Sequence, residues 1–261
     1  AVAVAFSNAS GATSSNSLRL IVIVQVVAAV ALWALSPFAV LPNPVEAFEA
    51  LGKLWLNEGL SHELMISFVL NLEALALSAI ISLGLAYLTV LPFFRPIVAA
   101  VSKGRFLGLI GLTFVFTLMI GGGHKLKLAL LVFGMTVFFL TSMAAVIAAI
   151  PKEQFDYART LRMSEWQVVW EVVILGTIDE AIEVLRQNAA IGWMMLTMVE
   201  GISRSEGGIG AMLLSQNKHF HLAEVFAIQL LILCVGVAQD FAIGLLKRTL
   251  CPYALLTVEG R

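Results

Sequence analysis

Residues 154–172 read QFDYARTLRMSEWQVVWEV, and this polar stretch lies between two segments that are apolar enough to span a bilayer. It carries five charged residues but no glycine or proline, the residues that punctuate most loops. Helix formers and large aromatic residues take their place. The stretch therefore predicts an ordered helical segment rather than a flexible connection.

The local pattern predicts two short helices joined by a corner. Pro151 suits the first turn of a helix, and Ser164 stands three residues before Gln167, the spacing of a capping box. The first helix should end near Arg162 and the second should begin after Ser164. Such a pair is either a helical hairpin on the membrane surface or a rigid protrusion that docks a soluble partner.

The spacing of side chains in the first helix predicts two faces. Lys152, Asp156 and Arg159 should share one of them, and Phe155, Ala158 and Leu161 should lean toward the other.

Composition sets the class of protein. The 261 residues are 60% hydrophobic and 13% charged, with mean hydropathy +0.95, whereas soluble domains carry about 25% charged residues. We therefore expect an integral membrane protein. The net charge of −1 excludes a generally basic nucleic-acid binder. Cys234 and Cys251 predict no structural disulfide and have no metal-binding spacing.

Six segments approach the roughly 20 apolar residues that a spanning helix needs. They are residues 19–40, 64–90, 105–121, 126–149, 177–202 and 222–246. Between the first two, Phe48, Leu51, Leu54 and Trp55 recur at helical spacing and predict an amphipathic helix at the interface. With the N-terminus inside, ten Lys and Arg residues fall on inner segments and five on outer ones, which favours both termini inside.

The stretch DYARTLRMSEWQVVWEVVIL resembles the EAA loop of bacterial ABC-importer permeases. Asp156, Tyr157 and Ala158 take the places of Glu-Ala-Ala, and ARTL at 158–161 matches the common form of the motif. Arg162 stands where glycine is usual, and Ile174-Leu175 replaces Leu-Pro.

Other stretches extend the resemblance over about residues 20–250. LPNPVEAFEAL, PKEQFDYARTL, LRQNAAIGW and VEGISRSEGGIGAMLL are similar to the nitrate, sulfonate, taurine and bicarbonate branch of these permeases. The resemblance implies an all-α fold of about six transmembrane helices, the type I importer permease with a cytoplasmic coupling helix. The expected divisions are a disordered tail at 1–18, a permease domain at 19–250 with its coupling region at 151–172, and a cytoplasmic tail at 251–261.

The resemblance also implies a function. The chain would form the translocation pathway of an ATP-driven importer for a small solute such as nitrate, a sulfonate, taurine or bicarbonate. Implied partners are cytoplasmic ABC ATPases, a periplasmic or lipoprotein substrate-binding protein and a second permease copy, in the bacterial inner membrane. ATP and magnesium would bind the ATPase and no cofactor would bind this chain. Coupling to the ATPase would use Phe155, Asp156, Tyr157, Ala158, Arg159, Leu161 and Arg162.

Two sets of residues in the fifth predicted span are candidate sites. Asn188, Trp193, Thr197 and Glu200 are expected along the translocation pathway, with Glu200 alternatively paired to Arg204. Met194, Met195 and Met198 either line the pathway as well or fill gaps in helix packing. Asp179, Glu183 and Arg186 follow helical spacing near the inner end. They form either a self-paired charged patch or a gate, because ionisable groups within membranes are often functional.

Absent motifs narrow the alternatives. The chain has no Walker A sequence, HExxH or GxSxG, so neither ATP hydrolysis nor another enzymatic activity is expected of it. His219 and His221 share a face only in an extended segment and have no evident third ligand, so no metal site is expected. The alternative function is a stand-alone secondary transporter or channel, which the lack of a visible inverted repeat disfavours.

Overall fold

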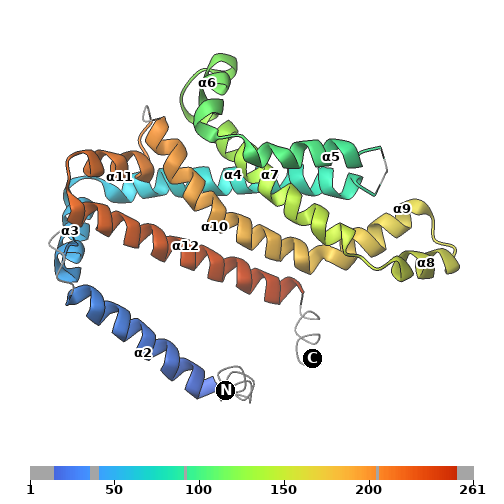
Figure 1. Ribbon diagram of the computed structural model, residues 1–261, viewed down its shortest axis with the longest axis horizontal. Helices are drawn as coiled ribbons and strands as arrows, with labels where there is room; N and C mark the ends of the chain where they lie inside the picture. The colour runs from blue at the N-terminus through green and yellow to red at the C-terminus, as the bar shows by residue number, and fades with distance from the viewer. Residues whose placement is uncertain (1–14, 36–40, 91–92, 204–205, 252–261) are drawn as a thin grey trace, which may run out of the picture.

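The computed structural model describes residues 15–35, 41–90, 93–203 and 206–251, and within these ranges all regular structure is helical. The elements are α2 (Ser15–Ala34), α3 (Pro44–Asn57), α4 (Leu60–Leu88), α5 (Arg95–Ser102), η2 (Lys103–Phe106), α6 (Leu109–Ile120), α7 (His124–Ala148), α8 (Lys152–Thr160), α9 (Glu165–Val168), η3 (Val169–Ile174), η4 (Leu175–Thr177), α10 (Ile178–Ile202), α11 (Ile209–Lys218) and α12 (Leu222–Leu250). The long helices α4, α10 and α12 lie side by side, with α3 and α11 at one end and α8 and α9 at the other (Figure 1).

Helices occupy most of the described part of each of the six segments that the sequence marks as spans. Among the described residues, α4, α7 and α12 are long and apolar enough to cross a membrane, with mean hydropathies of 2.1, 2.3 and 2.0. A fourth span is possible only if a bent pair is counted as one: the helix over Arg95–Phe106 meets α6 at 112°. The expected third span is therefore broken, because Leu107 and Gly108 interrupt the helix between η2 and α6.

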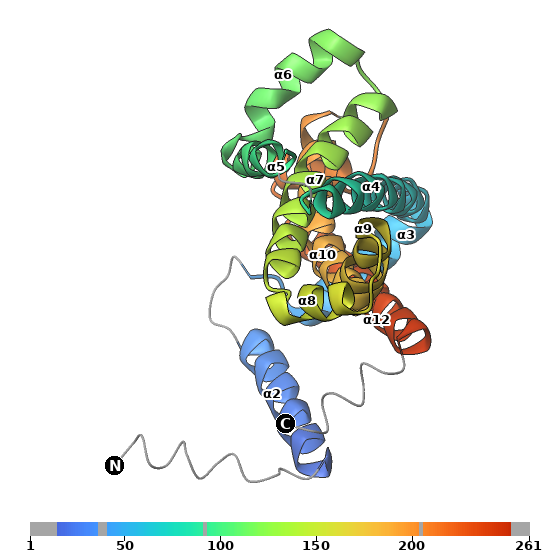
Figure 2. The same cartoon turned by 90° about the vertical axis from the view of Figure 1, so that its right-hand side faces the viewer.

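The N-terminal helix α2 extends away from the rest of the molecule (Figures 1 and 2). Its side chains from Leu20 to Leu35 are nearly all exposed. Near the C-terminal end of α2, Trp33 contacts other parts of the chain. Its indole stacks on Phe226 with ring centroids 6.4 Å apart and donates a hydrogen bond to the carbonyl of Pro42 at 3.0 Å. Helix α2 begins at Ser15, inside the predicted disordered tail, whereas residues 1–14, 36–40 and 252–261 lie outside the described ranges.

The predicted amphipathic helix is α3. Asn43 and Glu46 cap it reciprocally, and Pro44 occupies its first turn. Leu54 is buried against α12, whereas Phe48 and Trp55 are exposed on the outer side. An exposed aromatic face of this kind suits the interface between water and lipid.

The core lies where α4, α7 and α10 meet. Its largest cluster joins Leu70 and Leu75 of α4, Leu130 and Met135 of α7, and Leu196 of α10. Helix α4 also buries a stripe of small and polar residues: Ser67, Asn71, Ser78 and Ser82. Lipid is as apolar as leucine, so the helices of a membrane protein turn their small and polar side chains toward one another.

Candidate functional site

The motif segment forms two helices with a sharp corner, as predicted. Helix α8 ends at Thr160, and the amide of Met163 donates to the carbonyl of Ala158 at 3.3 Å while that of Arg162 donates to Arg159 at 2.9 Å. These two bonds make a Schellman motif, which satisfies the last carbonyls of a helix and needs a left-handed residue. Arg162 is that residue, with φ 55°. The glycine that this position usually carries would adopt the same φ without strain.

The second helix begins at the predicted cap. The hydroxyl of Ser164 accepts from the amide of Gln167, and the side chain of Gln167 accepts from the amide of Ser164. Helical structure then continues from Glu165 to Ile202 without a loop, through the π-helix η3 and the 3-10 turn η4. Helices α9 and α10 are thus joined by helical turns rather than by a loop, and π-helical segments inside helices are frequent at functional sites. Pro151 is the N-cap of α8 rather than its first helical residue.

The two expected faces of α8 are only partly correct. Lys152, Asp156 and Arg159 do share one face, but Phe155 lies with them, since all four line the same cavity. Ala158 is buried at 2% exposure, whereas Tyr157 and Leu161 are 68% and 59% exposed. Tyr157 of α8 and Leu161, which caps its end, are therefore the large apolar side chains that this segment exposes on its outward face.

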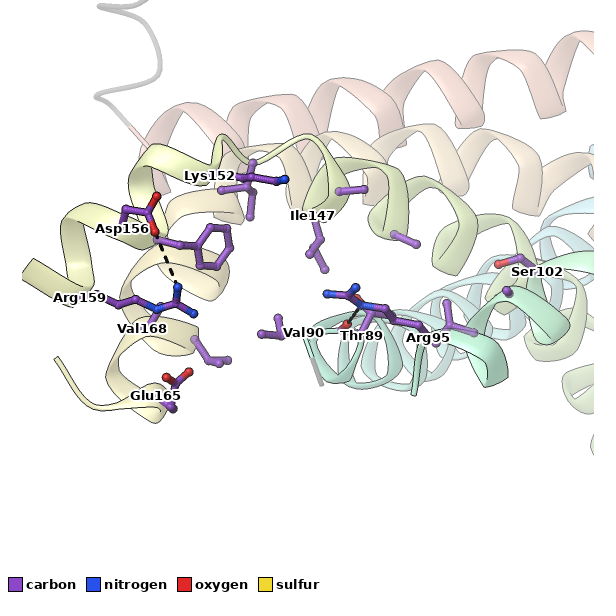
Figure 3. A pocket seen from close by; sticks show the side chains of 17 residues that line it. Thr89, Val90, Arg95, Ser102, Ile147, Lys152, Asp156, Arg159, Glu165 and Val168 are labelled. Carbon is purple, nitrogen blue, oxygen red and sulfur yellow. Dashed lines mark hydrogen bonds and ion pairs between the residues drawn. The ribbon is translucent and has the colours of Figure 1, made fainter. Parts of the chain in front are cut away.

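A cavity of about 750 Å³ lies behind α8 and reaches to the ends of α4, α5 and α7 (Figure 3). Arg95 projects into it from α5, and Arg159 projects from α8 on the opposite side. The guanidinium of Arg159 lies 3.7 Å from the carboxylate of Asp156. Asp156, the expected docking charge, therefore already has a partner within the chain.

Two charged residues near the α8 end of α10 are paired across helices. Arg186 donates to Asp240 of α12 at 2.6 Å and lies 3.5 Å from Glu183, which Lys247 of α12 contacts at 3.1 Å. Asp179 has no ion-pair partner among the described residues. Glu183 and Arg186 thus pair with each other, as a self-paired patch predicts, and also with Lys247 and Asp240, which join α10 to α12.

Three of the four expected pathway residues are buried inside this chain. The indole of Trp193 donates to Gln239 of α12 at 2.7 Å, and the amide of Asn188 donates to the carbonyl of Met135 at 3.3 Å. Glu200 is 0% exposed. Only Thr197 is partly exposed, and its hydroxyl donates to the carbonyl of Met194.

The open face of α10 includes two of the methionines considered from the sequence, Met194 and Met198. It holds Gln187, Ala190, Met194, Met198 and Ile202. Met194 is 66% exposed and Met198 is 39% exposed. Beside this stripe, a second cavity of about 380 Å³ is lined in part by Thr197, Asn217 and Gln229.

Glu200 belongs to a network that holds the loop between α10 and α11. Its carboxylate accepts from the hydroxyl of Ser67 at 2.7 Å and from the amide of Gly210 at 2.9 Å. Nearby, Lys127 donates to the carbonyl of Gly207 at 2.7 Å and Glu63 accepts from the amide of Gly208. The alternative partner, Arg204, lies outside the described residues.

Comparison with solved structures identifies the architecture. One match is "Inward facing conformations of the MetNI methionine ABC transporter: CY5 SeMet soak crystal form", with a TM-score of 0.60. The chains are 17% identical, and the alignment covers 76% of this chain and 97% of the other. The fold is that of an ABC importer permease. No protein-family model and no curated protein sequence matches the chain.

Several polar residues that make contacts between helices were not expected from the sequence. Gln239 and Asp240 lie within the apolar helix α12, and both contact α10. Ser67 of α4 was missed as well. Two adjacent polar residues inside an apolar span were the available signal, because such residues usually face a polar partner. The described residues contain no group of three or more His, Cys, Asp or Glu side chains that could hold a metal ion.

Proposed function

We propose that the chain is the permease subunit of an ATP-driven importer and that α8 docks a cytoplasmic ATPase. The observation that carries this proposal is the placement of α8 and α9 between the spanning helix α7 and α10, in an ABC importer permease fold. Residues 149–151 and 161–164 are the only non-helical residues from α7 to the end of α10. A partner that moves α8 would therefore move both long helices with little slack.

Docking would use the outward face of α8. Tyr157 and Leu161 offer exposed apolar anchors of the kind that dominate binding energy at interfaces. The cavity side of α8, which carries Phe155, Asp156 and Arg159, would support the helix from behind. Ala158 would pack against the rest of the chain, and Arg162 would fix the turn between α8 and α9. Their position favours a role in holding the segment rather than in direct contact.

The pathway would lie between two copies of the chain. We propose a homodimer in which the open stripe of α10 faces its symmetry mate, because two half-sites are needed to enclose one pathway. Met194, Thr197 and Met198 would line it, with Asn188, Trp193 and Glu200 setting the position of α10. The sequence resemblance supports a small anion as substrate, such as nitrate, a sulfonate, taurine or bicarbonate, delivered by a binding protein.

The chain would lie in the bacterial inner membrane with both ends inside, as the distribution of Lys and Arg supports. ATP and magnesium would bind the ATPase partner. A cysteine at the exposed position 217, in the last turn of α11, should react with a membrane-impermeant reagent only from outside the cell. Reaction only from inside would refute the orientation.

Docking is tested by substitutions on the outward face of α8. Tyr157→Ala and Leu161→Ala should each reduce copurification of the ATPase, and together they should abolish it. Gln154→Ala shortens an exposed polar side chain on the same face, one turn before Tyr157, and is the matched control: it removes no apolar anchor and should have little effect. Full copurification with the double variant would show that this face is not the docking surface.

A further inference from the structure

The cavity behind α8 lies at the level where two membrane-spanning helices end. Thr89 and Val90 directly follow α4, and Ile147 and Ala148 form the last turn of α7. Both α4 and α7 are long and apolar enough to cross a bilayer. The opening of the cavity is therefore at the depth of lipid headgroups.

Basic groups converge on this opening from two separate elements. Arg95 comes from α5, and Lys152 and Arg159 come from α8 (Figure 3). Asp156 and Glu165 are the carboxylates among the lining residues. The lining thus carries three cationic side chains against two anionic ones, an excess of one positive charge.

The geometry leaves these cations able to bind a further anion. Arg95 uses its Nε to donate to the carbonyl of Thr89 at 3.1 Å, so its two terminal nitrogens stay free for a bidentate contact. Arg159 lies 3.7 Å from Asp156, beyond hydrogen-bond distance. Lys152 has no ion-pair partner among the described residues.

Most of the remaining lining is apolar, and Thr89 and Ser102 add two hydroxyl groups. Val90, Val98, Ile147 and Val168 contribute side chains with no hydrogen-bonding groups, and Phe155 adds an aromatic ring. A free inorganic anion would leave this surface uncovered. A molecule with a charged phosphate and an adjoining hydrocarbon part would cover both, and basic pockets between spanning helices bind anionic headgroups in this way.

We propose that this cavity binds an anionic phospholipid of the adjacent leaflet, with its phosphate between Arg95, Lys152 and Arg159. The phosphate would bridge α5 and α8, which make no hydrogen bond or ion pair to each other among the described residues. The lipid would then support α8 from behind while Tyr157 and Leu161 remain free on its outward face. This inference does not depend on the proposed function of the chain.

The test is thermal unfolding of the purified full chain in detergent, together with any subunits that copurify. It is titrated with short-chain phosphatidylglycerol, short-chain phosphatidylcholine or inorganic phosphate. A ligand that binds only the folded state raises the unfolding midpoint. Phosphatidylglycerol should raise it, and the other two should not.

Substitutions inside and outside the cavity test whether the lipid binds there. Arg95→Gln and Lys152→Gln should each weaken the apparent affinity for phosphatidylglycerol by about tenfold, since each removes a charge-assisted contact. Arg248→Gln, an exposed residue in the last turn of α12 outside the cavity, changes the net charge equally and should leave the affinity unchanged.

Three results would overturn the proposal. They are no shift of the wild-type chain with phosphatidylglycerol, an equal loss of affinity in Arg248→Gln, and inorganic phosphate reproducing the full effect of the lipid. The last result would reassign the cavity to a free anion.

Discussion

The hydroxyl of Ser67 donates a hydrogen bond to the carboxylate of Glu200 at 2.7 Å and accepts one from the amide of Ile209 at 2.8 Å. One small side chain of α4 thus joins α10 to the start of α11. Ser67 and Glu200 are both fully buried. The network sits at the end of the molecule opposite α8, where it fixes the loop that follows α10 (Figure 1).

Ser67→Ala should lower the free energy of unfolding by about 1–3 kcal/mol, because a buried carboxylate and a buried amide each lose a partner. Ser78→Ala is the matched control: this serine is equally buried on α4 but donates only to Leu75 of its own helix. Denaturant titration in detergent micelles measures both. An equal cost for the two variants would argue against the network.

Arg162→Gly should stabilise the chain. The left-handed conformation costs an ordinary residue about 1–2 kcal/mol, and the greater freedom of unfolded glycine offsets part of the gain. We expect a net increase of about 0.5–1 kcal/mol in the free energy of unfolding. Arg159→Gly, at a right-handed helical position in the last turn of α8, should instead lose about 1 kcal/mol. The same sign for both variants would contradict the corner geometry.

Gly210→Ala should disturb the contact between α10 and α11. A Cβ at this position would lie 2.5 Å from the carbonyl oxygen of Thr197, a backbone atom that cannot move aside. The expected loss is about 1–3 kcal/mol of unfolding free energy. Gly84→Ala has nothing within 4 Å of the added Cβ and should stabilise α4 by about 0.5–1 kcal/mol. Tolerance of alanine at Gly210 would mean that the two helices pack less closely.

Crosslinking tests which face of α10 meets a second copy. In a background with Cys234 replaced by serine, Met194→Cys should form an intermolecular disulfide on mild oxidation, because Met194 is 66% exposed. Trp193→Cys should not, because Trp193 is 5% exposed and faces the core of its own chain. A non-reducing gel distinguishes the outcomes. Crosslinking at 193 but not at 194 would reverse the assignment of the open face.

Features set by local sequence were predictable. The capping box of Ser164 and Gln167, the corner near Arg162 and the extents of α4, α7, α10 and α12 follow from side chains and hydropathy within a few residues. The helix over 105–121 was not predicted well, since hydropathy does not register a 112° bend.

Features set by tertiary packing were not predictable. Trp193 and Asn188 are expected along the pathway from the sequence. In the structure both are buried: the indole of Trp193 donates to Gln239, and the amide of Asn188 donates to the carbonyl of Met135. Phe155 was placed on the wrong face of α8 because helical spacing cannot say which face the cavity occupies. The pairing of Arg186 with Asp240 joins residues 54 positions apart, beyond any local pattern.

The most direct test of the account is the composition of the complex purified from native membranes. We predict one ABC ATPase chain for each copy of this chain, and its loss from the complex in the Tyr157→Ala and Leu161→Ala double variant. Mass measurement of the intact complex gives the ratio. A chain that purifies without an ATPase and transports solute by itself would contradict the central claim.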